Sequence, residues 1–136
     1  MVNACFLDFD GVVIVNGVFS KAAVFNLNSL LEKEPELKIV ISSSWRHKGL
    51  EFCKILLEEN GIDSDKVIGM TDAKLSEEGR GGHIERYLYS HDVDKFVILD
   101  DQGPKDMDNI SSYLVKTNPF VGLTASDVAK AIKILK

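Results

Sequence analysis

Short apolar runs alternate with longer periodic segments along the chain. Five short runs are continuously apolar, which is typical of strands buried on both faces of a sheet. They lie at 4–7, 37–41, 67–70, 96–99 and 113–115. Four longer segments carry apolar residues three and four positions apart, which predicts helices. They lie at 20–34, at 47–59, at 82–90 and after Thr124.

The order of these segments predicts an α/β fold with three layers. Strands that alternate with helices form βαβ units, so we expect a Rossmann-like sheet of about five parallel strands with helices on both faces. The 136 residues suffice for one domain, predicted to span 1–136. Ser20 is the expected N-cap of the first helix, Thr124 and Asp127 resemble a capping box, and Gly61 follows the second helix.

One segment interrupts the alternation. Residues 12–19 follow the first strand and carry Asn16-Gly17 between β-branched residues. An Asn-Gly pair is a strong signal for a two-residue hairpin turn. We therefore predict a small β-hairpin flap between the first strand and the first helix.

Composition narrows the class of protein. The net charge of −5 disfavours a protein that coats nucleic acid or lies on an anionic membrane. No apolar run reaches the eighteen or so residues of a membrane helix, and the acidic start does not resemble a signal peptide. Cys5 and Cys53 lie in apolar segments and are expected to be reduced, buried thiols. We expect a cytoplasmic protein with no membrane partner.

Polar clusters follow three of the predicted strands, at 8–11, 42–46 and 100–102. Ligands bind beyond the carboxyl ends of parallel strands, so four carboxylates and several hydroxyls are expected on one patch. Carboxylates at close range repel one another, and an all-oxygen ligand set suits Mg²⁺, which often shares a phosphate ligand. Each cluster alone has a simpler explanation, because Asp-Gly forms turns and Ser44 or the acidic pair is able to cap a helix.

Together these clusters resemble the motifs of the haloacid dehalogenase (HAD) superfamily. Residues 6–12, with two aspartates two apart, look like its first motif, 39–42 is similar to its second, and 97–101 looks like its fourth. Residues 42–46, 80–81 and 118–124 are similar to a small branch that has no cap domain. That branch includes the HAD domain of Swiss Army Knife RNA-repair proteins.

The resemblance implies a catalytic mechanism. Asp8 would be the nucleophile and form an aspartyl-phosphate, while Asp10 would act first as general acid and then as general base. Ser42 would donate a hydrogen bond to a phosphoryl oxygen, with help from the backbone N–H of Phe9 or Ser43. Charge also develops on the phosphoryl oxygens, which requires a protein cation. Arg80 is the first choice for that cation.

The remaining site residues are assigned with alternatives. Lys74 is the second choice for the cation, whereas Lys95 lies at the wrong end of the sheet. Mg²⁺ would be held by the Asp8 carboxylate, the Asp10 main-chain carbonyl and one acid of the fourth motif. Asp101 is favoured as that direct ligand, with Asp100 acting through water, although the opposite assignment stays open. Ser43, Arg46 and Lys74 are the candidate substrate-binding residues.

Two further side chains have competing interpretations. Trp45 either stacks on a nucleotide or packs the loop in which it lies. His83 either faces the site near Arg80 or is an ordinary helical histidine.

These expectations favour a Mg²⁺-dependent phosphatase with an uncapped site. Residues 11–41 and 47–79 leave no room for a cap, and an open site suits a bulky substrate such as an RNA or DNA end or a nucleotide. A local basic rim would come from Arg46, Lys48, Lys74 and Arg80. The alternatives are a non-catalytic phosphate-binding or regulatory module and a phosphotransferase. The protein is expected to be a monomer or a small homo-oligomer.

Overall fold

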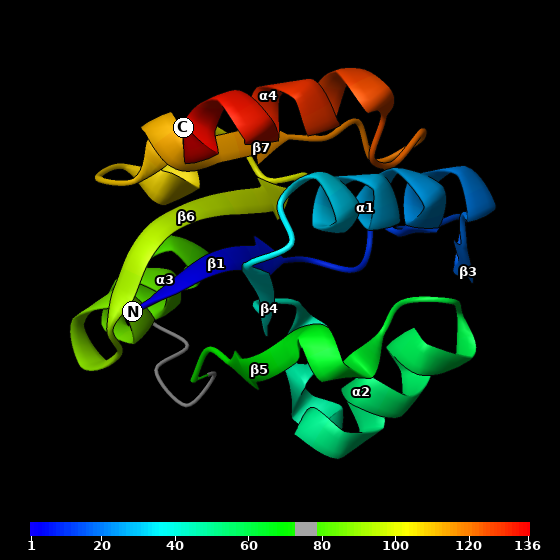
Figure 1. The fold of residues 1–136 in the computed structure, drawn as a ribbon, viewed down its shortest axis with the longest axis horizontal. Helices are drawn as coiled ribbons and strands as arrows, with labels where there is room; N and C mark the ends of the chain where they lie inside the picture. Colours follow the sequence, from blue (N-terminus) through cyan, green and yellow to red (C-terminus); the bar gives the residue numbers. More distant parts are fainter. Residues whose placement is uncertain (73–78) are drawn as a thin grey trace.

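Five parallel strands form one sheet in the order β5-β4-β1-β6-β7 (Figure 1). The computed structural model describes residues 1–72 and 79–136. The strands are β1 (Val2–Leu7), β4 (Leu37–Ile41), β5 (Val67–Met70), β6 (Val93–Asp100) and β7 (Leu114–Lys116). The helices are α1 (Lys21–Lys33), α2 (Leu50–Glu59), α3 (Gly79–Ser90) and α4 (Ala125–Leu135). The predicted α/β fold with a parallel sheet is confirmed.

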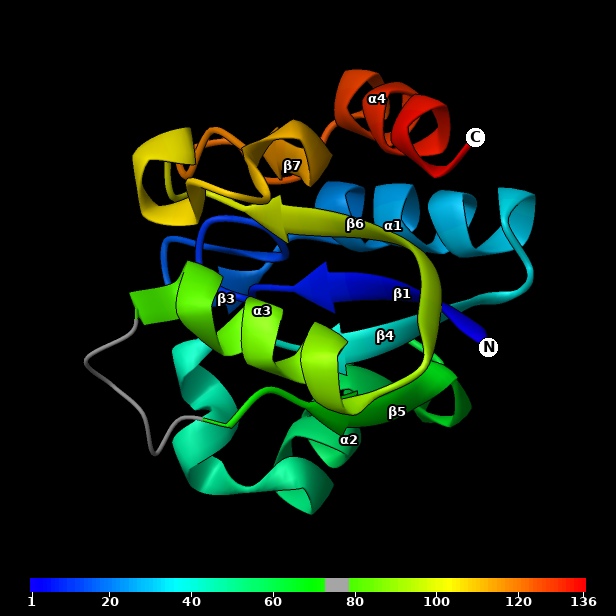
Figure 2. The same cartoon turned by 90° about the vertical axis from the view of Figure 1, so that its left-hand side faces the viewer.

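The sheet separates two apolar cores. Alternate side chains of β1 enter different cores, Cys5 and Leu7 on one face and Ala4 and Phe6 on the other. The first core packs against α1, α2 and α4, and the second packs against α3. Figure 2 shows α3 in front of the sheet. Both faces of β1 are therefore buried, which explains why its sequence is continuously apolar.

The predicted helix caps are confirmed. The Ser20 hydroxyl accepts a hydrogen bond from the backbone N of Ala23 at 3.1 Å. Thr124 and Asp127 form a complete capping box at the start of α4. Gly61 follows α2 with a positive φ of 89°, a conformation that glycine adopts without strain.

Two predicted helix boundaries are wrong. The helix predicted from residue 47 begins at Leu50, because residues 44–48 form a separate 3₁₀ turn and Gly49 has a φ of 93° that no α-helix contains. The helix predicted from Gly82 begins at Gly79. Glycine is a weak helix former, so the glycines of this first turn conceal it in the sequence.

The hairpin flap is present after β1. Strands β2 (Ile14–Val15) and β3 (Val18–Phe19) pair in antiparallel fashion. Asn16 and Gly17 form the turn with φ values of 53° and 80°, as a type I′ turn requires. Among the described residues, the flap and α1 are the only elements between β1 and β4. Those between β4 and α3 form α2, β5 and two short 3₁₀ turns.

Hydrogen bonds between strands continue one residue beyond the sheet. The backbone N–H groups of Asp8, Ser42, Thr71 and Thr117 each donate to a carbonyl oxygen of the adjacent strand at 2.9–3.0 Å. All four residues are buried, as is Asp100 at the end of β6. Each strand of the sheet thus ends in a buried polar residue, and we call these five residues the strand-end row.

No helix in the described part of the chain is long and apolar enough to cross a membrane.

Thr117 links the strand-end row to the turn that follows β1. Its hydroxyl donates to the carbonyl oxygen of Gly11 at 2.7 Å, and both groups are buried. We expect Thr117→Val to lower the free energy of unfolding by about 1–3 kcal/mol, because the Gly11 carbonyl loses its partner. Urea unfolding measures the change, and Thr117→Ser is the matched control that keeps the hydroxyl. Equal stability of Thr117→Val and the unchanged protein would contradict the prediction.

Candidate active site

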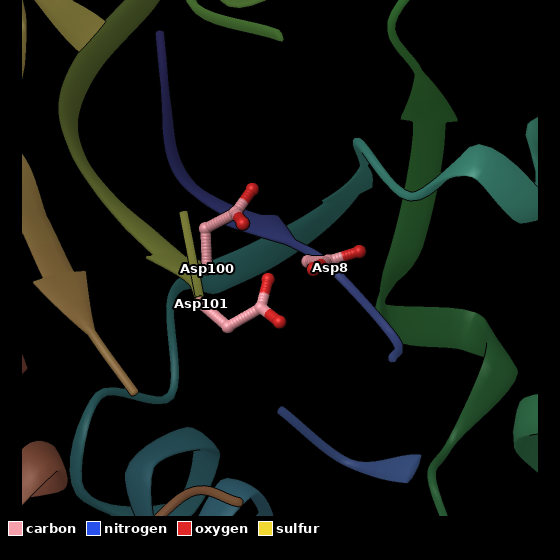
Figure 3. Close-up of side chains that lie close together, drawn as sticks. All are labelled: Asp8, Asp100 and Asp101. Carbon is pink, nitrogen blue, oxygen red and sulfur yellow. The ribbon is translucent and has the colours of Figure 1, made fainter. Parts of the chain in front are cut away.

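Three carboxylates lie together at the carboxyl ends of β1 and β6 (Figure 3). Asp8 directly follows β1, Asp100 ends β6 and Asp101 follows it. Since β1 and β6 are neighbours in register, one oxygen of each side chain lies within 4.8 Å of the others. We call Asp8, Asp100 and Asp101 the carboxylate cluster.

One guanidinium group bridges two members of the cluster. Arg80 comes from the first turn of α3, and its Nη1 lies 2.9 Å from Asp8 Oδ1 and 2.9 Å from Asp100 Oδ2. Backbone N–H groups support the same carboxylates, with Phe9 N donating to Asp8 Oδ1 and Gln102 N to Asp100 Oδ1, both at 2.9 Å. Lys74, the alternative cation, lies outside the described residues, and Lys95 is exposed near the start of β6.

The cluster carries more negative charge than Arg80 neutralises. Burial and, after it, the charge of Asp100 raise the pKa of Asp8 to about 8, although the charge of Arg80 opposes both effects. Burial and the neighbouring Asp100 also raise the pKa of Asp101. A site of this kind favours a bound cation, because a cation removes the repulsion between the carboxylates.

Gly11 permits the close approach of Asp101. The φ of Gly11 is 84°, and a Cβ added there would lie 2.4 Å from Asp101 Oδ2. Any other residue would displace this carboxylate from the cluster. The glycine of the first motif therefore has a packing role in the site as well as a role in the turn.

Ser42 carries a buried, unsatisfied hydroxyl at the end of the strand next to β1. The residue follows β4, and its backbone N–H donates to Leu7 O, directly before Asp8. Its Oγ is fully buried and has no hydrogen-bond partner among the described residues. A buried hydroxyl without a partner costs about 1–3 kcal/mol, and a bound ligand is one explanation for its presence.

Asp10 lies apart from the three clustered carboxylates. Its side chain is exposed, and its Oδ2 accepts a hydrogen bond from Trp45 Nε1 at 3.0 Å. Trp45 is half-buried, and its ring is parallel to that of Phe52, with centroids 6.4 Å apart. Lys48 Nζ lies 5.8 Å from the centroid of the Phe52 ring.

Ser43 and Arg46 hold the segment after β4 in place. The Ser43 hydroxyl accepts from Trp45 N at 3.2 Å, so Ser43 caps the 3₁₀ turn, and the alternative of Ser44 as cap is wrong. Arg46 Nε donates to Ser43 O at 2.8 Å, and its Nη1 contacts Thr71 Oγ1 and His83 Nδ1.

Arg46 is therefore an internal cross-link. Its side chain is buried, which excludes it from an exposed basic rim. Burial lowers the pKa of Arg46, and the positive charge of Arg80 lowers it further. His83 is also buried and contacts Arg46, so it is not a surface histidine.

Sequence reasoning missed two members of the strand-end row. Thr71 follows β5 and contacts Arg46, while Thr117 follows β7 and holds the Gly11 carbonyl. The only signal in the sequence was position. Thr71 directly follows the apolar run 67–70, and Thr117 lies two residues after the run 113–115.

Comparison with known proteins identifies the family. Residues 4–128 match the family described as the HAD domain in Swiss Army Knife RNA repair proteins. The chain belongs to this HAD family. No curated protein and no solved structure matches it significantly. Membership indicates a phosphatase-type function, and HAD proteins typically use Mg²⁺.

The donor set of the HAD domain fits a hard divalent cation. Three carboxylates of the described chain offer oxygen ligands within 4.8 Å of one another, and oxygen is the donor that Mg²⁺ prefers. Gly11 leaves the space in which Asp101 joins them.

The raised pKa of Asp8 predicts how stability changes with pH. A carboxyl group whose pKa is higher in the folded state favours folding while it is protonated. This contribution is fully present below the unfolded-state pKa. This contribution is lost as the pH rises through the folded-state pKa. For Asp8 the window runs from 3.8 to about 8. In metal-free buffer, Asp8→Asn should therefore raise the unfolding temperature by roughly 3–8 °C at pH 8.5 and change it little at pH 5.

Calorimetry at the two pH values measures this difference. Asp94→Asn, at an exposed position of β6, is the control for removing a surface charge. A destabilised Asp8→Asn protein at pH 8.5 would show that the ion pair with Arg80 outweighs the repulsion.

Proposed function

We propose that this HAD domain is a Mg²⁺-dependent phosphatase that hydrolyses a phosphomonoester through an aspartyl-phosphate. The observation that carries the proposal is the placement of Asp8. Its carboxylate lies against the Arg80 guanidinium and within reach of Asp100 and Asp101. Ser42, whose buried hydroxyl has no partner among the described residues, follows the adjacent strand β4. This placement supports Asp8 as the nucleophile, Arg80 as the cation and Ser42 as the hydroxyl donor for a bound phosphoryl group.

The reaction has two steps in this proposal. In the first, Asp8 attacks phosphorus, the bond to the leaving oxygen breaks, and Asp10 gives its proton to that oxygen. In the second, Asp10 takes a proton from a water molecule that attacks phosphorus. The bond to Asp8 breaks, and inorganic phosphate and the free Asp8 carboxylate are released.

Electrostatic stabilisation supports both steps. Arg80 Nη1 already contacts Asp8 and favours its ionised, nucleophilic form. The same guanidinium and the Ser42 hydroxyl are the donors proposed for the phosphoryl oxygens. Mg²⁺ would be held by the carboxylate cluster together with the Asp10 main-chain carbonyl, and it supplies charge neutralisation at the phosphoryl group.

The proposed substrate is the phosphate of a nucleic-acid end or a nucleotide. The family description names RNA repair proteins. The described elements between β1 and β4 and between β4 and α3 include no cap domain, which supports a site suited to a bulky substrate. Of the residues predicted to form a basic rim, Lys48 is exposed near Phe52 and Arg80 is half-buried at the cluster, whereas Arg46 is buried in the interior. A non-catalytic module does not need the full set of Asp8, Asp10 and Arg80. A phosphotransferase would differ only in its acceptor.

Hydrolysis of p-nitrophenyl phosphate tests the reaction. We expect turnover with Mg²⁺, loss of turnover with a chelator, and recovery when Mg²⁺ is added back. Asp8→Asn should lower kcat/KM by about 10³-fold or more, because the nucleophile is removed. The Asp94→Asn protein is the matched control and should keep full activity. Absence of turnover on aryl phosphates, nucleotides and phosphorylated oligonucleotides would contradict the proposal.

A panel of 5′- and 3′-phosphorylated RNA and DNA, nucleotides and sugar phosphates tests the substrate class. A kcat/KM at least tenfold higher for one of the nucleic-acid ends or nucleotides would support the proposed substrate. Preference for sugar phosphates would contradict it. Formation of a new phosphate ester in the presence of added alcohols would indicate a phosphotransferase.

Replacement of Ser42 is expected to lower activity without lowering stability. Ser42→Ala removes a buried hydroxyl that has no partner, so the free energy of unfolding should be unchanged or higher by up to about 1 kcal/mol. Loss of a donor to the phosphoryl group should lower kcat/KM by roughly 10²-fold. Urea unfolding and p-nitrophenyl phosphate kinetics measure the two effects. Lower stability with unchanged kinetics would show that the hydroxyl serves the fold.

A further inference from the structure

Asp10 has a single anchor for its carboxylate. The side chain is exposed, it lies outside the carboxylate cluster, and its hydrogen bond from Trp45 Nε1 at 3.0 Å is the one that the described residues provide. An exposed aspartate without a partner samples several rotamers, and a proton donor in the wrong rotamer does not reach the leaving oxygen. Whatever orients Asp10 therefore influences proton transfer.

Trp45 is itself held firmly. Its backbone N donates to the Ser43 hydroxyl, and its carbonyl oxygen accepts from Cys53 Sγ at 3.3 Å. The indole ring packs against the apolar core and is parallel to Phe52. The donor that reaches Asp10 thus comes from a fixed position, although it lies 35 residues away in the sequence.

The donor chemistry of indole favours one oxygen of Asp10 as the carrier of the proton. Indole Nε1–H is a donor only, so the oxygen that it contacts must accept. That oxygen is Oδ2. The carbonyl oxygen of a protonated carboxyl group is a better acceptor than its hydroxyl oxygen, so this contact favours the acidic proton on Oδ1. The hydrogen bond thus orients the carboxyl group and favours the proton on the oxygen that Trp45 does not contact.

We propose that Trp45 is a positioning residue for proton transfer, holding Asp10 Oδ2 so that Oδ1 delivers the proton to the leaving oxygen. The inference rests on the proposed function, in which Asp10 is the general acid. The proton moves from Asp10 Oδ1 to the leaving oxygen as the bond between that oxygen and phosphorus breaks and Asp8 bonds to phosphorus. Asp10 is left as a carboxylate whose Oδ2 still accepts from Trp45.

Two substrates of similar size distinguish a loss of proton transfer from a general loss of activity. Phenyl phosphate releases a more basic oxygen than p-nitrophenyl phosphate and depends more on a proton donor. Trp45→Phe keeps an aromatic ring but removes the N–H. We expect kcat/KM, which reports the transfer to Asp8, to fall about tenfold for phenyl phosphate and less than about threefold for p-nitrophenyl phosphate.

Trp45 is the single tryptophan of the chain, which allows a sharper replacement. Biosynthetic substitution with benzothienylalanine, in which sulfur replaces the indole N–H, keeps the shape of the ring and its packing. The same unequal loss is expected for this protein even if Trp45→Phe folds poorly. Phe52→Leu disturbs the ring beside Trp45 but leaves the N–H in place, and it should affect both substrates equally.

The outcomes distinguish failure of the role of Trp45 from failure of the proposed function. Equal losses on both substrates in the benzothienylalanine protein would overturn the role of Trp45. Asp10→Asn is the reference variant. Because it removes the acid itself, the difference between its losses of kcat/KM on the two substrates should be larger than for the Trp45 replacements. If Asp10→Asn also affects both substrates equally, or if the unchanged protein hydrolyses neither, the proposed function fails and the inference fails with it.

Discussion

The site depends on one electrostatic constraint, the close approach of three carboxylates at the ends of two adjacent strands. Burial and mutual repulsion raise the pKa of Asp8 to about 8, so the fold holds these groups together against their preference to separate. Arg80 offsets part of the repulsion by bridging Asp8 and Asp100. Backbone N–H groups offset another part. What remains is a site that favours a bound cation, which the proposed function places at a phosphoryl group.

Much of this arrangement follows from sequence because it follows from strand order. Acidic residues directly after two apolar runs must meet if the runs are neighbouring parallel strands, as β1 and β6 are. The capping box at Thr124 and the hairpin turn at Gly17 are local patterns, and they form as predicted. Arg80, the first choice for the site cation, contacts the cluster, whereas Lys95 lies near the start of β6.

Other features depend on contacts between distant residues and have no local signature. Arg46 comes after a run of serines, where a surface position is expected. It is nevertheless buried and contacts Ser43, Thr71 and His83. The hydrogen bond from Trp45 to Asp10 depends on how the 3₁₀ turn after β4 packs. The start of α3 is hidden because its glycines resemble a loop in the sequence.

The central position of β1 has a consequence for the motions of the protein. This strand pairs with β4 on one side and β6 on the other, and the N–H of Asp8 extends the pairing beyond the strand. Its amide hydrogens should exchange with solvent only when most of the sheet opens, whereas the two-residue strands of the flap can open locally. The Asp8 carboxylate is thus anchored in the part of the sheet that should open most slowly. In the proposed function, the adjustments that admit a substrate would fall to the flap.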